Sequence, residues 1–450
     1  MFKVRLVIGM VLVCLGARAH AADDLSPYEE YEKKIKAAQV VGPLKGDIFG
    51  ENISLYDRTV GFRATDVDVP GNNALPVAVG REFKVMNRRT EYVAKGFGDW
   101  EIDTPRVYGE FLADKGWVTI SASPTARCSV PSRPNAAMTV NGITYPGTAD
   151  DIWHGYYLHV PNAGEQELLV DNQTKTPRPT DGVSRPWITK EGWRLGCLAS
   201  VSNYGGEGFI AISPAGVKYY FDYAVVTNIK GYKVSFTGTG SIATRVRVAL
   251  VASRVEDRFG NWVTYSYTGD KLSSIQSSDG RAITLSYNGD LISSIQANGQ
   301  TWNYGYELST AYPTPQGAYR LKTVTQPDGS QWTYSIASGN MLPTREPPAG
   351  GGASNCVSQP DPMNGAVSLQ ITHPSGATGV FAFEYQRQYR NHTPIHPCDY
   401  AGQTPTPYVP GYFDNYVLKS KTVTGPGLPQ QVWSYGADAP ATKFYTSGQA

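Results

Sequence analysis

Apolar and aromatic residues alternate with polar ones after a glycine at five places in the chain. In each place the third, fifth and seventh residues after the glycine are apolar or aromatic. The five sets are Gly216 with Tyr219, Phe221 and Tyr223; Gly260 with Val263, Tyr265 and Tyr267; Gly280 with Ile283, Leu285 and Tyr287; Gly299 with Trp302, Tyr304 and Tyr306; and Gly329 with Trp332, Tyr334 and Ile336. Because side chains alternate between the two faces of a strand, this stride predicts a turn that leads into a strand with one buried face.

The spacing of the glycines predicts a repeat array. Gly260, Gly280 and Gly299 are 20 and 19 residues apart, which leaves room for about one β-hairpin in each unit. We therefore predict an all-β fold, in which a repeat array of antiparallel hairpins forms a curved ribbon or a partial hollow shell.

Turn residues support this interpretation. Asn288-Gly289 is the strongest hairpin signal, because both residue types tolerate the positive φ of a type I′ turn. It is expected to join residues 283–287 to residues 291–295. The turns between units are expected at Asp279-Gly280, Asn298-Gly299 and Asp328-Gly329.

The pattern divides the chain into three parts. Residues 1–21 are expected to be a signal peptide, residues 22–205 a β-rich region with a short helix at 23–40, and residues 206–450 the repeat region. Proline-rich insertions interrupt the repeat at 307–319 and 337–366. The chain ends without an element that would cap the last strand, so we expect a continuation of the array or a partner to cover that edge.

Two stretches of this region resemble a known repeat. Residues 269–281 and 319–329 are similar to the tyrosine-aspartate (YD) repeat of RHS proteins, which runs Tyr-Asp, a short turn with Gly, Leu-x-x-Val/Ile, then Asp-Gly. The resemblance covers residues 250–340 and extends over 206–436. The aspartate of the motif is replaced by Thr268 and by Asn288, and Phe221-Asp222 is the nearest dyad.

The resemblance implies a spiral β-sheet shell, which in RHS toxins encloses a C-terminal segment and in other members presents a surface. Encapsulating members also carry a self-cleaving aspartate pair near an Asp-Pro-x-Gly motif. Here Asp361-Pro362-Met363-Asn364 has no glycine at the fourth position. We therefore expect a non-enzymatic exported scaffold, part of the shell of a polymorphic toxin or of a cell-surface interaction system. Its expected partners are a C-terminal RHS continuation or a toxin cargo.

The N-terminus predicts export. Lys3 and Arg5 precede an apolar stretch, and Ala19-His20-Ala21 is a small-x-small cleavage site. Cleavage after Ala21 would give a secreted, periplasmic or cell-surface protein. After removal of the signal, no segment is apolar enough to span a membrane.

Four cysteines remain once the signal is removed: Cys128, Cys197, Cys356 and Cys398. An even number in an exported chain indicates disulfides, and four cysteines allow three pairings. We favour Cys128–Cys197 and Cys356–Cys398, because each pair closes a shorter loop within one segment. His392 and His396 lie near Cys398, but we expect no metal site there, because neighbouring prolines prevent the helix that would bring them together.

Composition narrows the chemistry. Lys and Arg total 40 against 39 Asp and Glu, a balance that argues against nucleic acid as a partner. No Gly-x-Ser-x-Gly elbow, phosphate loop or His-Glu-x-x-His motif occurs, and we expect no catalytic residues and no cofactor. His154 and His159 are expected to be packing or surface residues. Asp99, Glu101 and Asp103 are interpreted as a charged outer face, although paired carboxylates also occur in glycosidases.

Aromatic residues give the alternative function, a glycan-binding cell-surface module, because Tyr and Trp stack on sugar rings. Those in the array share its buried stride and are expected to be structural. The candidate ligand contacts are therefore the loop aromatics Tyr400, Tyr408, Tyr412, Phe413 and Tyr416.

Overall fold

The computed structural model describes residues 47–55, 58–85, 95–140, 143–145, 153–171, 183–235, 240–309, 318–338, 366–389, 406–407 and 412–436. The chain divides into two compact units, Met1–Ile48 and Phe49–Ala450, and every strand belongs to the second. The described residues form strands and turns without a helix, which confirms the all-β prediction, and they hold no helix that could cross a membrane. The expected signal peptide and the helix at 23–40 lie outside them.

A four-stranded antiparallel sheet, here called the small sheet, comes first in the described chain. Its strands, in spatial order, are β1 (Glu51–Ile53), β2 (Val60–Asp68), β3 (Ala78–Val85) and β4 (Glu101–Ile102). A separate two-stranded hairpin consists of β6 (Met138–Val140) and β7 (Ile143–Tyr145).

The second sheet has 21 strands within the described residues, and most of them pair with their neighbours in sequence. We call the run from β10 to β27 the ribbon. Its first strands are β10 (Leu169–Val170), β11 (Trp187–Ile188), β12 (Arg194–Leu198), β13 (Gly208–Ile212), β14 (Lys218–Ser235) and β15 (Gly240–Glu256). The next are β16 (Trp262–Thr268), β17 (Lys271–Ser277), β18 (Ala282–Asn288), β19 (Leu291–Ala297), β20 (Gln300–Ser309), β21 (Ala318–Thr325) and β22 (Gln331–Ser338). The last are β23 (Ala366–Thr372), β24 (Thr378–Tyr389), β25 (Thr406–Pro407), β26 (Tyr412–Gly425) and β27 (Leu428–Ser434).

The ribbon forks at β15. Residues 254–256 of this strand pair with β16, whereas residues 245–251 pair with β5 (Arg106–Leu112). From β5 the sheet continues to β8 (Tyr157–Val160) and β9 (Gly164–Glu167), and we call these three strands the branch. The strands on either side of the boundary expected at residue 205 belong to one continuous sheet.

The hairpin expected at residues 283–295 is confirmed, but its turn type differs. Asn288 pairs with Leu291, so the two-residue loop is Gly289-Asp290, and only Gly289 has a positive φ, of 60°. Glycine at the first loop position is typical of a type II′ turn. Two positive φ values in succession, as type I′ requires, occur instead at Asn298 and Gly299.

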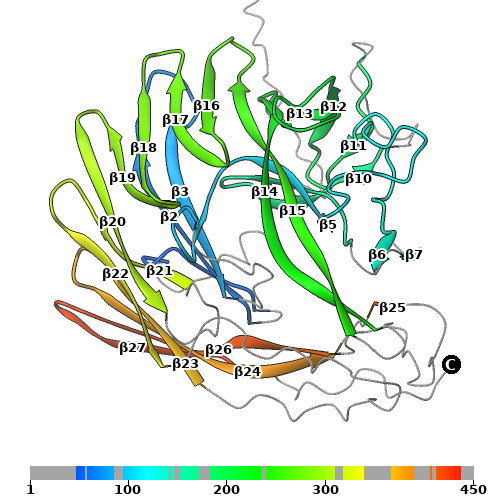
Figure 1. Ribbon diagram of the computed structural model, residues 1–450. Helices are drawn as coiled ribbons and strands as arrows, with labels where there is room; N and C mark the ends of the chain where they lie inside the picture. Colours follow the sequence, from blue (N-terminus) through cyan, green and yellow to red (C-terminus); the bar gives the residue numbers. More distant parts are fainter. Residues whose placement is uncertain are drawn as a thin grey trace, which may run out of the picture. The chain divides into compact units, whose positions relative to one another are not determined.

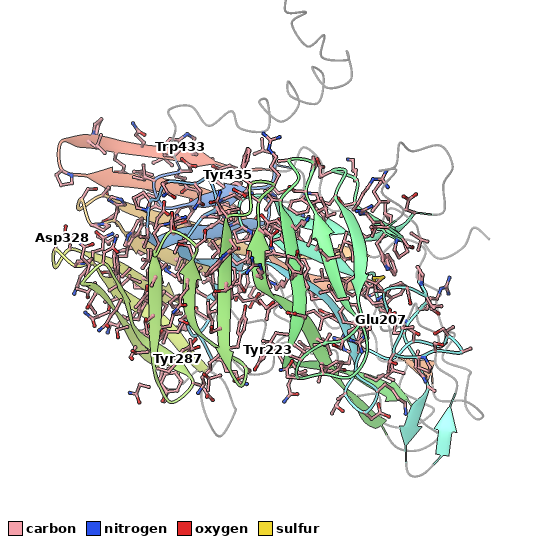
Figure 2. The ribbon with its side chains drawn as sticks, turned by 90° about the horizontal axis from the view of Figure 1, so that it is seen from above. Glu207, Tyr223, Tyr287, Asp328, Trp433 and Tyr435 are labelled. Carbon is pink, nitrogen blue, oxygen red and sulfur yellow. A yellow bond between two sulfur atoms is a disulfide. The ribbon has the colours of Figure 1, made fainter. Side chains whose placement is uncertain are left out.

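A tyrosine makes the same hydrogen bond in three successive hairpins. Each strand has a bulge directly before this tyrosine, and the tyrosine hydroxyl donates to a backbone carbonyl 14 or 15 residues earlier. The bonds are Tyr267 to Ala252 (3.0 Å), Tyr287 to Leu272 (2.8 Å) and Tyr306 to Ile292 (2.7 Å). Figure 2 shows Tyr287 and Tyr223 at the same edge of the ribbon, where Tyr223 donates to the carbonyl of Gly269 at 2.7 Å. The tyrosine therefore ties each hairpin to the one before it.

The apolar face predicted by the stride is buried against the small sheet. Figure 1 shows β2 and β3 beside β18 and β19 of the ribbon. Aromatic rings join the two: Phe381 of β24 meets Phe62 of β2 with ring centroids 4.9 Å apart, and Tyr334 of β22 meets Trp100 at 5.1 Å. The predicted stride residues of the ribbon pack in the same core, except Tyr223, which packs against Tyr108, Ala249 and Val251.

Two neighbouring residues of β19 test this arrangement. Ile295 is 0% exposed whereas Gln296 is exposed on the opposite face. We expect Ile295→Ala to lower the free energy of unfolding by about 2–5 kcal/mol, because it removes buried methyl groups and leaves a cavity. Gln296→Ala should change it by less than about 0.5 kcal/mol. Urea denaturation followed by fluorescence measures both, and equal losses would contradict the assignment of faces.

Candidate functional site

A buried arginine connects the small sheet to the ribbon. Arg81 of β3 is 0% exposed; its Nε donates to Asp66 of β2 at 2.8 Å and its Nη2 to the hydroxyl of Tyr334 at 2.6 Å. The guanidinium also lies 4.4 Å from the centre of the Trp100 ring. Tyr304 of β20 donates to the same Asp66 oxygen at 3.1 Å. Burial raises the pKa of Tyr334 to about 12, although the charge of Arg81 tends to lower this pKa. The hydroxyl of Tyr334 therefore remains neutral.

The turn between β17 and β18 clasps the β2–β3 loop. Arg281 Nη1 donates to the carbonyls of Val69 and Leu75, each at 3.1 Å, and its Nη2 donates to the Asn73 side chain at 3.0 Å. Asp279 accepts from Arg281 Nε at 2.8 Å, and the hydrogen bond from Arg281 lowers the pKa of this carboxyl. The Asp-Gly-Arg turn of the repeat is thus also a contact with the small sheet.

A group of five titratable side chains lies where the small sheet meets the branch. We call Glu82, Asp103, His159, Arg63 and Arg106 the charged junction. Glu82 and Arg63 belong to β3 and β2, Asp103 follows β4, and Arg106 and His159 belong to β5 and β8. The side chains of His159, Asp103 and Glu82 are 1%, 4% and 8% exposed.

Short contacts join every member of the charged junction. His159 Nε2 lies 2.6 Å from Asp103 Oδ1 and 3.8 Å from Glu82 Oε1. Arg106 donates to Glu82 at 2.8 Å, and Arg63 Nε lies 2.9 Å from Asp103 Oδ2. Burial tends to raise the pKa of Asp103, but the hydrogen bond with His159 and the nearby guanidiniums outweigh it and lower this pKa. Burial, together with Arg106, lowers the pKa of His159.

The same side chains offer the ligand types of a metal site. One imidazole nitrogen and two carboxylate oxygens, from His159, Asp103 and Glu82, lie within 4.8 Å of one another. However, Arg63 and Arg106 already neutralise both carboxylates, and a cation would have to displace them. The donor set therefore fits a closed ionic cluster better than a metal ion.

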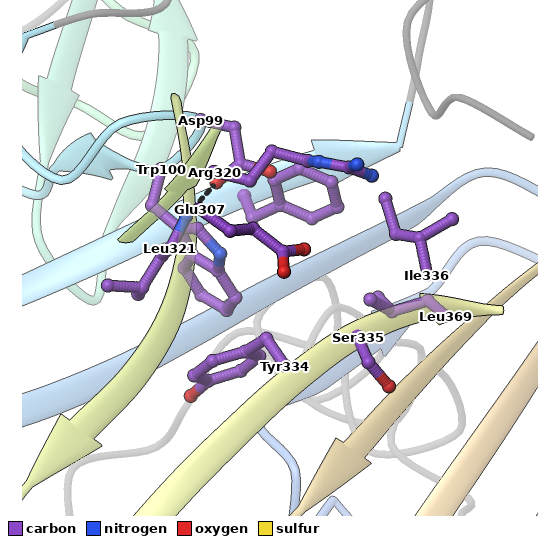
Figure 3. A pocket seen from close by; sticks show the side chains of 10 residues that line it. Asp99, Trp100, Glu307, Arg320, Leu321, Tyr334, Ser335, Ile336 and Leu369 are labelled. Atoms are coloured by element: carbon purple, nitrogen blue, oxygen red, sulfur yellow. Dashed lines mark hydrogen bonds between the residues drawn. The ribbon is translucent and has the colours of Figure 1, made fainter. Parts of the chain in front are cut away.

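A small pocket lies between Trp100 of the small-sheet region and strands β20 to β23 (Figure 3). Its free volume is about 10 Å³, enough for about one water molecule. Asp99 accepts a hydrogen bond from the Leu321 backbone at 2.9 Å, and Arg320 lines the wall with Nε and Nη1 buried and without a hydrogen-bond partner among the described residues. A space of this size does not hold a substrate-sized molecule.

The predicted contact residues fall mostly outside the described side chains. Tyr400 and Tyr408 lie outside the described residues, and only the backbone of Tyr412 and Phe413 is described, in β26. Tyr416 is 3% exposed, and its hydroxyl bonds to that of Tyr385. Its ring therefore belongs to the core in this structure.

One predicted disulfide is present. Cys128 and Cys197 are bonded, with Cα atoms 5.5 Å apart, whereas Cys356 and Cys398 lie outside the described residues. Glu207, labelled in Figure 2, accepts hydrogen bonds from the backbone of Cys128 at 3.0 Å and of Ser129 at 2.8 Å. The bond and the carboxylate together hold this loop against the ribbon.

The interpretation of Asp99, Glu101 and Asp103 as a charged outer face is wrong. As whole residues, Asp99 and Asp103 are 8% and 7% exposed. Of the three acidic residues, only Glu101 faces solvent. Their burial follows from partners distant in sequence, namely the Leu321 backbone, His159 and Arg63. His154 is exposed and His159 buried, in agreement with surface and packing roles.

Some functional contacts were missed from the sequence. Ser273 donates to the carbonyl of Ser266 at 2.9 Å, and Ser293 donates to that of Ser286 at 3.2 Å. Both carbonyls lie at the bulge before the repeated tyrosine. The recurrence of serine at one repeat position was the available signal.

Comparison with known proteins identifies no family. No protein-family model matches the chain, and no curated protein matches its sequence. Among solved structures, the chain is similar to the N-terminal domain of the effector protein SpvB from Salmonella typhimurium strain LT2, with 11% identity over 83% of this chain and 100% of that chain. The TM-score is 0.19, too low to indicate a shared fold, so the similarity carries no conclusion about function.

The Arg81–Asp66 pair makes a prediction about stability. Asp66→Ala leaves the buried guanidinium without its carboxylate and should lower the free energy of unfolding by about 3–5 kcal/mol. The double variant Asp66→Ala/Arg81→Met should recover part of this loss, because it also removes the buried charge. Thermal denaturation of the three proteins checks this, and a double variant less stable than the single one would contradict it.

The disulfide makes a second prediction. Cys128→Ser/Cys197→Ser should lower the free energy of unfolding by about 2–5 kcal/mol, since the bond closes a loop between residues 69 positions apart. Denaturation with and without reductant measures the effect. A reductant effect of the same size in the double variant would show that another bond is responsible.

Proposed function

We propose that this chain is an exported, non-enzymatic scaffold of the RHS/YD-repeat type, whose ribbon forms part of a shell that holds a toxin or another polypeptide. The repeated tyrosine bond is the observation that carries the proposal. Tyr267, Tyr287 and Tyr306 each follow a bulge and each donate to the preceding repeat. This is the repeat position of the tyrosine in the family motif that the sequence resembles.

The chemistry of the described residues supports a scaffold. The carboxylates and the imidazole of the charged junction are buried and paired internally, and the pocket beside Arg320 has room for about one water. The buried contacts of Arg81 and Arg281 join the small sheet to the ribbon. Such contacts hold strands in fixed positions, as the wall of a shell requires.

Export is part of the proposal and has separate support. The Cys128–Cys197 bond is typical of proteins that fold in an oxidising compartment. This agrees with the signal peptide expected at residues 1–21.

The proposal is tested by isolating the tagged full chain from its host after cross-linking. We expect a second polypeptide in about equal amount, protected from added protease while the ribbon is intact. At temperatures where the Ile295→Ala variant begins to unfold, this protection should be at least about tenfold lower. A tenfold change in the equilibrium between folded and unfolded chain needs only about 1.4 kcal/mol. Gln296→Ala is the matched control and should protect normally.

Two outcomes would overturn the proposal. In the first, the chain is isolated without a second polypeptide and itself binds glycans, and Tyr412→Ala/Phe413→Ala abolishes that binding. The chain would then be the glycan-binding module instead. In the second, the chain cleaves a polysaccharide, and Glu101→Gln abolishes this turnover. The chain would then be an enzyme.

A further inference from the structure

In the charged junction, two side chains of the branch contact the small sheet: Arg106 of β5 pairs with Glu82 of β3, and His159 of β8 pairs with Asp103. His159 lies on β8 of the branch, and its neighbour Asp103 is anchored to the small sheet by a backbone hydrogen bond to Gly80 of β3, at 2.9 Å. Arg63 and Glu82 reach the junction from β2 and β3. A change in the charge of His159 therefore acts at the boundary between two sheets.

The hydrogen bonds accommodate only the neutral imidazole. At 2.6 Å from the Asp103 carboxylate, Nε2 carries the proton and donates it. Nδ1 is buried and has no hydrogen-bond partner among the described residues. A second proton would create a buried N–H at Nδ1 with no acceptor, which is costly in a site that excludes water.

The charges of the junction lead to the same conclusion. Two carboxylates, Glu82 and Asp103, face two guanidiniums, Arg63 and Arg106. Around them Glu101 contacts Arg106 and Arg247, Glu110 contacts Arg245 and Arg247, and Glu165 contacts Lys84 and accepts from Tyr108. At the centre of the junction, Glu82 and Asp103 balance Arg63 and Arg106 while His159 is neutral, and protonation of His159 would add a buried positive charge.

We propose that the charged junction is an acid-sensitive joint, in which protonation of His159 loosens the small sheet from the branch while the hairpins of the ribbon stay paired.

The direction of the pH dependence follows from linkage. Because burial lowers the pKa of His159 in the closed joint below its ordinary value of 6.5, the open joint takes up the proton more readily. The closed joint is therefore most stable above pH 6.5 and loses stability as the pH falls from 6.5 towards the lowered pKa. The carboxyl of Asp103 has a lowered pKa as well, and its contribution is lost only below its ordinary value of 3.8. Glu165, whose pKa Lys84 and Tyr108 lower despite burial, loses its contribution only below its ordinary value of 4.5. Of these three groups, only the histidine therefore acts between pH 6.5 and 4.5.

Hydrogen exchange detected by mass spectrometry tests the joint in the full chain. After correction for intrinsic exchange, protection of peptides from β3 and β8 should fall by up to about tenfold per pH unit from pH 6.5 to about 4.5. Peptides from β18 and β19 should not change. His159→Gln keeps a donor for Asp103 but does not titrate, so protection of its β3 and β8 peptides should stay constant with pH. His154→Gln is the matched control, because His154 is exposed five residues away, and it should behave as the wild type.

Equal pH slopes in the wild type and His159→Gln would overturn the proposal. If His159→Gln does not fold, the wild type alone still decides. Loss of protection confined to β3 and β8 supports the joint, whereas uniform loss that includes β18 and β19 contradicts it.

Discussion

Each hairpin of the ribbon has one apolar face, and a two-stranded hairpin cannot bury that face by itself. The neighbouring hairpins extend the face, and only a second layer can remove it from water. The small sheet supplies that layer, with Phe62 and Trp100 packed on Phe381 and Tyr334. The apolar face of the ribbon thus makes a second layer necessary. The contacts of Arg281 and the charged junction fix the position of that layer.

Buried charges contribute more to this position than to stability. An ion pair such as Arg81–Asp66 gains little over well-packed apolar side chains, because both ions lose their hydration. A displaced small sheet, however, would leave a buried ion without its partner, at a cost of several kcal/mol. Aromatic packing alone would hold the small sheet on the ribbon less specifically. We infer that one relative position of the two sheets is selected by Arg81, Arg281 and the charged junction.

The sequence predicts the features that depend on near neighbours. The stride after each glycine identifies the buried face, because alternation is a property of a single strand, and the Gly-rich turns mark the hairpins. The loop at Gly289 is offset by one residue because the pairing of Asn288 with Leu291 decides which residues form the loop. Asp99 and Asp103 were misplaced for a related reason: their partners, Leu321 and His159, are far away in the sequence. Acidic residues at alternate positions give no sign of such partners, so the charged junction could not be predicted.

The fork at β15 has a consequence for the order in which the chain folds. Glu110 of β5 meets Arg245 across 135 residues, and Glu51 of β1 meets Lys421 across 370. The strands synthesised first thus obtain their contacts with the ribbon last, whereas each later hairpin forms from residues that emerge together. Contacts this distant close slowly. The strands of the small sheet can pair with one another as they emerge, but its apolar face must stay exposed until the ribbon strands that cover it have been synthesised.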